Sequence, residues 1–135
     1  FRSKPDPLQA IENGRFECVS HIGSFTNKQD YYDALSSSHV VLSTALHEFQ
    51  GLAMLEGAAY GCVPLAPNRL AYPEWIPSDY LYPDSQSESQ QSESIIQCLK
   101  QWIEHGLPHK IDITPYYWES LARDYEHAFH MTANI

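Results

Sequence analysis

The sequence predicts an α/β fold built on a parallel, doubly wound sheet. Apolar runs rich in β-branched and aromatic residues predict four short strands, near 16–22, 39–43, 63–66 and 80–82. Segments with apolar residues at helical spacing separate these runs. Strands that alternate with helices are typical of a parallel sheet covered on both faces, so we expect a Rossmann-like domain.

The stretch 39–67 reads as strand, loop, helix and strand without interruption. The apolar runs at 39–43 and 63–66 enclose a helix predicted over 51–60, and Gly61 stands where a left-handed C-terminal cap needs no Cβ. The two strands of such a unit run parallel. The loop before the helix should therefore open at the C-terminal edge of the sheet, where open α/β sheets bind ligands.

The other elements follow from caps, prolines and apolar stripes. In chain order they are a loop end or frayed helix within 1–14, a helix over 27–37 capped by Asn27, a helical turn opened by Pro73, an exposed polar loop over 84–94 running into a helix stopped by Gly106, and a last helix from Pro115 to about Met131.

Composition narrows the functional classes. The chain has 135 residues, 43% of them hydrophobic, which suits one globular domain with a core. No apolar run approaches 18 residues, so no membrane span is predicted. The net charge of -9 argues against binding of nucleic acid by this piece alone, because such binding depends on Lys and Arg that neutralise phosphates. Three scattered cysteines without metal-like spacing predict reduced thiols in a cytoplasmic protein. No cofactor is expected, because the sequence has neither an Asp-x-Asp motif to hold a metal on a diphosphate nor the glycine-rich fingerprint of dinucleotide binding.

Two glutamates flank the start of the central helix. Glu48 is predicted in the loop and Glu56 in the helix, eight positions later. If both were helical they would be about 12 Å apart along the axis, too far to act as a carboxylate pair on one glycosidic bond. Such a spacing suits a long ligand, with an anion meeting the free N–H groups of Gly51, Leu52 and Ala53 between them. A sugar nucleotide has this layout.

These residues resemble a known family. The pattern E-x7-E, followed by a glycine and by a proline before an apolar residue, is similar to that of the C-terminal, donor-binding domain of retaining GT-B glycosyltransferases. The longer string STALHEFQGLAMLE…GCVPLAP…YPEWIP…YLY resembles the glycosyltransferase-like domain proteins more closely. The resemblance implies that residues 1–135 form one partial C-terminal domain, and that an N-terminal acceptor domain lies outside this chain.

The resemblance also implies roles for the loop residues. Glu56 would bind the ribose hydroxyls of the nucleotide, where the alternative is a solvent-facing helix residue. Glu48 would orient the hydroxyls of the transferred sugar without acting as a nucleophile. His47 is either an acid or base near the sugar or a hydrogen-bonding residue of the loop. Phe49 and Gln50 would also bind the donor, as side chains that line the sugar pocket. They differ from the residues usual at these positions in the wider family, so this lining would differ too.

The activity implied is transfer of a hexose with retention from a nucleotide-sugar donor, best matched by GDP-mannose. Queuosine in tRNA would be the acceptor, held mainly by the absent domain, and this chain alone is expected to be inactive. Arg69, Tyr72 and Glu74 either touch a ligand or form a structural turn, and the turn is favoured. The alternative function is a non-catalytic Rossmann-like module that binds a nucleotide or a protein partner for regulation.

Overall fold

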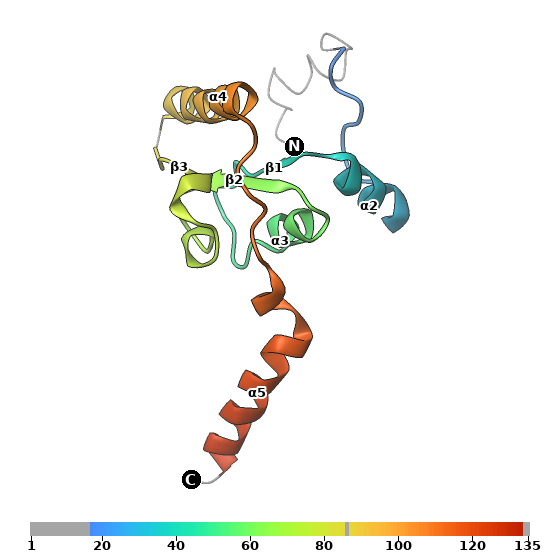
Figure 1. Cartoon of the computed structure of the whole chain (residues 1–135), viewed down its shortest axis with the longest axis vertical. Helices are drawn as coiled ribbons and strands as arrows, with labels where there is room; N and C mark the ends of the chain where they lie inside the picture. The colour runs from blue at the N-terminus through green and yellow to red at the C-terminus, as the bar shows by residue number, and fades with distance from the viewer. Residues whose placement is uncertain (1–16, 86, 134–135) are drawn as a thin grey trace, which may run out of the picture. The chain divides into compact units, whose positions relative to one another are not determined.

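The computed structural model describes residues 17–85 and 87–133 (Figure 1). Contacts divide the chain into two units, Phe1–Tyr31 and Tyr32–Ile135, and the sheet lies in the second. The loop or frayed helix expected within 1–14 lies outside the described residues.

The second unit is built on a parallel three-stranded sheet. Its strands are β1 (Val40–Leu42), β2 (Val63–Pro67) and β3 (Leu81–Tyr82), in the spatial order β1-β2-β3. Both pairs are parallel, with Val40 opposite Val63 and Ala66 opposite Leu81. The predicted α/β class and three of the four predicted strands are therefore confirmed.

Helices cover both faces of this sheet (Figure 1). Val63 and Leu65 of β2 pack with Ile95 and Trp102 of α4 (Glu88–His105). Ala66, which points to the other face, packs with Met54 of α3 (Leu52–Ala59). All five residues of β2 are buried, because a central parallel strand is covered on both sides.

The contact between α3 and β1 depends on a glycine. A Cβ placed on Gly57 would lie only 2.7 Å from a methyl carbon of Val41. The helix can thus approach the strand closely because this position has no side chain. This close packing fixes where α3 begins relative to the end of β1.

The remaining elements largely follow the predictions. They are α2 (Lys28–Ser37), η1 (Tyr72–Glu74), η2 (Ser78–Tyr80), η3 (Thr114–Tyr116) and α5 (Trp118–Ala133). Asn27 caps α2, since its side-chain oxygen accepts the Asp30 N–H at 2.8 Å. Gly106 ends α4 with a φ of 92°. Among the described residues, no helix has both the length and the apolar character needed to cross a membrane.

Two sequence expectations are wrong within the described part. Residues 17–22 form a turn and irregular chain instead of a strand, and Phe16 lies outside the described residues. Val19 and Ile22 are 38% and 43% exposed. A strand needs a hydrogen-bonded neighbour, and the described residues of the first unit contain none, so the apolar run alone does not make one.

The polar stretch predicted as a loop over 84–94 is shorter than expected. Helix α4 begins at Glu88, with the Ser87 side chain accepting the Gln90 N–H at 3.5 Å. Its first turns carry Gln, Glu and Ser and face solvent, so they lack the apolar stripe that marks a helix in sequence. An N-cap and helix-favouring Glu and Gln residues suffice to start the helix here.

Candidate functional site

A loop over 43–51 joins the C-terminal end of β1 to the start of α3. The residues predicted from sequence all lie on this loop or on the helix that follows it: His47, Glu48, Phe49 and Gln50 in the loop, Gly51 at the helix N-cap, and Leu52, Ala53 and Glu56 in α3. The topology therefore brings the candidate residues to the edge of the sheet where the parallel strands end.

Gly51 makes the turn into α3. Its φ is 73°, in the left-handed region that favours glycine. A Cβ at this position would lie 3.2 Å from Cε1 of Tyr72 and 3.4 Å from Nε1 of Trp75. Both the backbone conformation and the nearby aromatic rings thus favour a residue without a side chain. The Trp75 indole N–H is buried and has no hydrogen-bond partner in the part of the chain that the structure describes.

The start of α3 presents backbone N–H groups. The N–H groups of Met54 and Leu55 both donate to the Gly51 carbonyl at 3.0 Å. The N–H groups of Leu52 and Ala53 precede the first residues that donate to the Gly51 carbonyl. They therefore lie at the N-terminal end of the helix, which carries a partial positive charge. Leu52 is 58% exposed, which leaves this end open to solvent. The arrangement can accept an anionic group.

The Glu48 carboxylate is folded onto its own loop. Its Oε1 atom accepts the N–H of Phe49 at 2.9 Å and that of Gln50 at 3.3 Å. Hydrogen bonds from the backbone N–H of Gly51, and then from Gln50 and Phe49, lower the pKa of Glu48 below its ordinary value of 4.5. The carboxylate is therefore ionised at neutral pH. The Gly51 N–H that lowers this pKa is one of the groups expected from sequence to meet an anion of the ligand.

The other predicted side chains at the site are open to solvent. Phe49 is 93% exposed, and His47 and Gln50 are also exposed. Glu56, the fifth residue of α3, lies on an exposed part of that helix. Within the tip of the loop, residues 46–50, Glu48 alone is half-buried. The tip therefore offers its side chains to a ligand without enclosing one.

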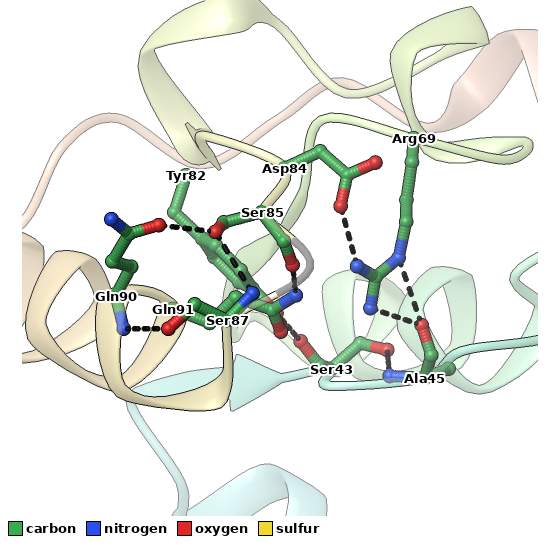
Figure 2. A network of polar contacts seen from close by, with 9 residues as sticks. All are labelled: Ser43, Ala45, Arg69, Tyr82, Asp84, Ser85, Ser87, Gln90 and Gln91. Carbon is green, nitrogen blue, oxygen red and sulfur yellow. Dashed lines mark hydrogen bonds and ion pairs between the residues drawn. The ribbon is translucent and has the colours of Figure 1, made fainter.

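The base of the loop, residues 43–45, is bonded to the sheet by groups of which sequence reasoning singled out Tyr72 and missed Ser43 and Tyr82. The Ser43 N–H donates to the Leu65 carbonyl at 3.0 Å and so continues the pairing of β1 with β2. The hydroxyls of Ser43 and Tyr72 are 2.6 Å apart. The Tyr82 hydroxyl donates to the Ser43 carbonyl at 2.9 Å, as Figure 2 shows. Tyr72 and Tyr82 are both fully buried, so these anchors lie inside the fold.

Arg69 provides a further anchor (Figure 2). Its Nε and Nη2 groups donate to the Ala45 carbonyl at 3.2 and 2.7 Å, and Nη1 meets Oδ1 of Asp84 at 2.6 Å. Arg69 and Tyr72 therefore contact the protein itself, which agrees with the structural role favoured from sequence, whereas Glu74 is exposed. Its position two residues after β2, at the same sheet edge as the loop, is the signal that singled out Arg69 in the sequence.

Two cysteines of the second unit, Cys62 and Cys98, are at least partly buried. Burial raises the pKa of the Cys62 and Cys98 thiols, which disfavours the reactive thiolate. Within residues 17–85 and 87–133, no three or more His, Cys, Asp or Glu side chains are grouped so that they could hold a metal ion.

Comparison with known proteins identifies a glycosyltransferase-like relative. No family model matches the chain. The chain is 48% identical over 82 residues to a tRNA-queuosine alpha-mannosyltransferase of Drosophila melanogaster. The match covers 61% of this chain and 22% of the relative, so the chain matches about a fifth of that protein's length. The likeness therefore concerns one part of a larger protein.

Proposed function

We propose that this chain is the donor-binding part of a retaining glycosyltransferase of the GT-B type. The observation that carries the proposal is the 48% identity to a named mannosyltransferase. The 43–51 loop and α3 are compatible with it, because Glu48 comes before and Glu56 after an exposed helix start at the C-terminal edge of the parallel sheet. That edge is where α/β folds usually bind nucleotides.

In this proposal the site binds an elongated donor. The N–H groups at the start of α3 face the diphosphate, and the Glu56 carboxylate accepts the two ribose hydroxyl protons. Glu48 lies beside the sugar and orients its hydroxyls. Since Glu48 now accepts N–H groups from its own loop, donor binding would exchange some of these bonds for bonds to the ligand.

The proposed donor is GDP-mannose and the proposed acceptor is queuosine in tRNA. Both follow the activity named for the relative and the resemblance of the sequence motifs. The chain's net charge of -9 does not suit direct binding of a polyanion. The tRNA would therefore be held mainly by another domain of the natural protein.

The proposed chemistry is substitution at the anomeric carbon on one face of the sugar. The bond from this carbon to the diphosphate oxygen breaks as the acceptor hydroxyl oxygen bonds to it on the same face. The departing phosphate takes the hydroxyl proton, so no nucleophile from the protein is needed. The protein contributes by positioning the sugar and stabilising the charge of the diphosphate.

The test uses the natural full-length protein that contains this chain. It is incubated with GDP-mannose or UDP-glucose and with tRNA that carries or lacks queuosine, and sugar transfer is measured. We expect mannose transfer to queuosine-containing tRNA only. Glu56→Gln should raise the donor KM about 10- to 100-fold, because it weakens a charged hydrogen bond made in both ground and transition states.

Glu48→Gln should instead lower kcat roughly 10²-fold, because it disturbs the orientation of the reacting sugar. Glu104→Gln is the matched control, since Glu104 is exposed near the end of α4. The reverse pattern of KM and kcat effects would contradict the assigned roles. Nucleotide binding without any transfer would favour a non-catalytic binding module.

A further inference from the structure

One side chain connects the segments that follow all three strands. Arg69 lies two residues after β2, Asp84 two residues after β3, and Ala45 three residues after β1. The guanidinium donates twice to the Ala45 carbonyl and once to the Asp84 carboxylate (Figure 2). The C-terminal ends of the three strands are therefore joined through one cation.

The setting of Arg69 makes these contacts hard to replace. Its side chain is 13% exposed, whereas that of Asp84 is 47% exposed. A cation largely removed from water is destabilising unless its N–H groups are satisfied. The rigid fork of a guanidinium can meet a carbonyl and a carboxylate in different directions at once, which a lysine ammonium group on a flexible stem does poorly.

A direct contact between Arg69 and the donor phosphate fits these observations less well. Three N–H groups of the guanidinium are already used, and Asp84 neutralises its charge at 2.6 Å. A phosphate would have to compete with this carboxylate. The contacts favour a role in holding the protein itself.

The anchored atom lies close to the candidate site in the chain. Ala45 comes three residues before Glu48, and the Ala45 N–H donates to the Ser43 hydroxyl at 3.2 Å. We propose that Arg69, paired with Asp84, is a positioning residue that sets where the 43–51 loop leaves the sheet, so that Glu48 and the start of α3 meet the donor correctly. This inference rests on the function proposed above.

The experiment compares Arg69→Lys and Asp84→Asn in the natural full-length protein. The matched controls are Arg123→Lys and Asp124→Asn, which change the same residue types at exposed positions of α5. Hydrogen exchange without any nucleotide should become roughly tenfold faster for the amides of 45–50 in both test variants, whereas the amides of β2 keep their rates. Unchanged exchange in the loop would overturn the proposal.

Kinetics give a second readout that a purely structural role would not move. Both test variants should lower kcat by about 10- to 100-fold with a smaller change in donor KM, because misplacing reacting groups by about 1 Å has effects of this size. A variant that fails to fold is recognised because it lacks a cooperative thermal unfolding transition. Asp84 is the more exposed of the two residues, so Asp84→Asn is the variant less prone to misfold. Control variants should keep wild-type kcat and KM.

The sign of the Asp84→Asn effect separates the two possible roles of Arg69. If Arg69 positions the loop, GDP affinity should stay equal or fall when Asp84 is neutralised. Tighter GDP binding by Asp84→Asn would overturn the proposal, because it would show that the released guanidinium binds phosphate. If the wild-type protein transfers no sugar, the proposed function fails; faster loop exchange in both variants then still supports the anchoring, and unchanged exchange overturns it.

Discussion

The base and the tip of the 43–51 loop are held in different ways. The base is bonded to buried or half-buried side chains that lie 24 to 39 residues away in sequence, namely Arg69, Tyr72 and Tyr82. At the tip, Phe49 is 93% exposed and Glu48 bonds to the N–H groups of the next residues. Long-range contacts thus fix where the loop starts, while local bonds shape the part that would meet a ligand.

The largest expected effect comes from removing an aromatic ring under the base. Tyr72 is 1% exposed and packs with Met54, Ala66 and Ile76. Tyr72→Ala should lower the free energy of unfolding by about 3 to 5 kcal/mol, because it leaves a cavity. Phe49→Ala at the tip is the control and should change it by less than about 0.5 kcal/mol. Urea unfolding measures both, and similar losses would contradict the comparison.

Gly51 lies between the tip and the helix. Gly51→Ala should lower the free energy of unfolding by about 1 to 3 kcal/mol, because a left-handed residue acquires a Cβ beside the Tyr72 ring. The matched control is Gly23→Ala: that position also has a positive φ, 97°, but no atom of the described residues lies within 4 Å of an added Cβ. Urea unfolding should show the larger loss for Gly51→Ala. An equal loss in both variants would mean that the aromatic rings do not restrict position 51.

Removing a single hydrogen bond at the base of the loop should lower the free energy of unfolding by a smaller amount. Tyr72→Phe removes the hydroxyl that lies 2.6 Å from the Ser43 hydroxyl and should lower the free energy of unfolding by about 1 kcal/mol. In a double-mutant cycle with Ser43→Ala, the two changes should not be additive, because they remove the same bond. Strictly additive losses in urea unfolding would show that these hydroxyls do not interact.

The smallest effect concerns the charge at the tip. Because N–H groups of the loop lower the pKa of Glu48, its ionised form is favoured by the folded state. The contribution of Glu48 to stability is therefore present above its ordinary pKa of 4.5 and is lost as the pH falls through the lower, folded value. An NMR titration of the Glu48 carboxyl carbon should show a midpoint below 4.5, and a midpoint at or above 4.5 would contradict the bonds to the loop.

Elements of the fold that depend on local signals could be predicted. The helix expected over 51–60 is observed as α3, Leu52–Ala59, and the β2 run is buried on both faces. Apolar spacing and a proline or glycine at a turn are properties of neighbouring residues, so the sequence displays them directly. The strand expected over 16–22 was wrong in its described part because pairing requires a partner that local sequence does not reveal.

The same distinction holds for the candidate site. The sequence alone placed His47 and Glu48 on the loop before a helix and Gly51 at the start of that helix, because β-α-β order dictates where such loops lie. It did not show that Glu48 would bond to its own loop, and the ligand roles of these residues stay predictions. Only the tertiary structure decided that Arg69 reaches Ala45 and Asp84, since packing of three strands brings together residues that are distant in the chain.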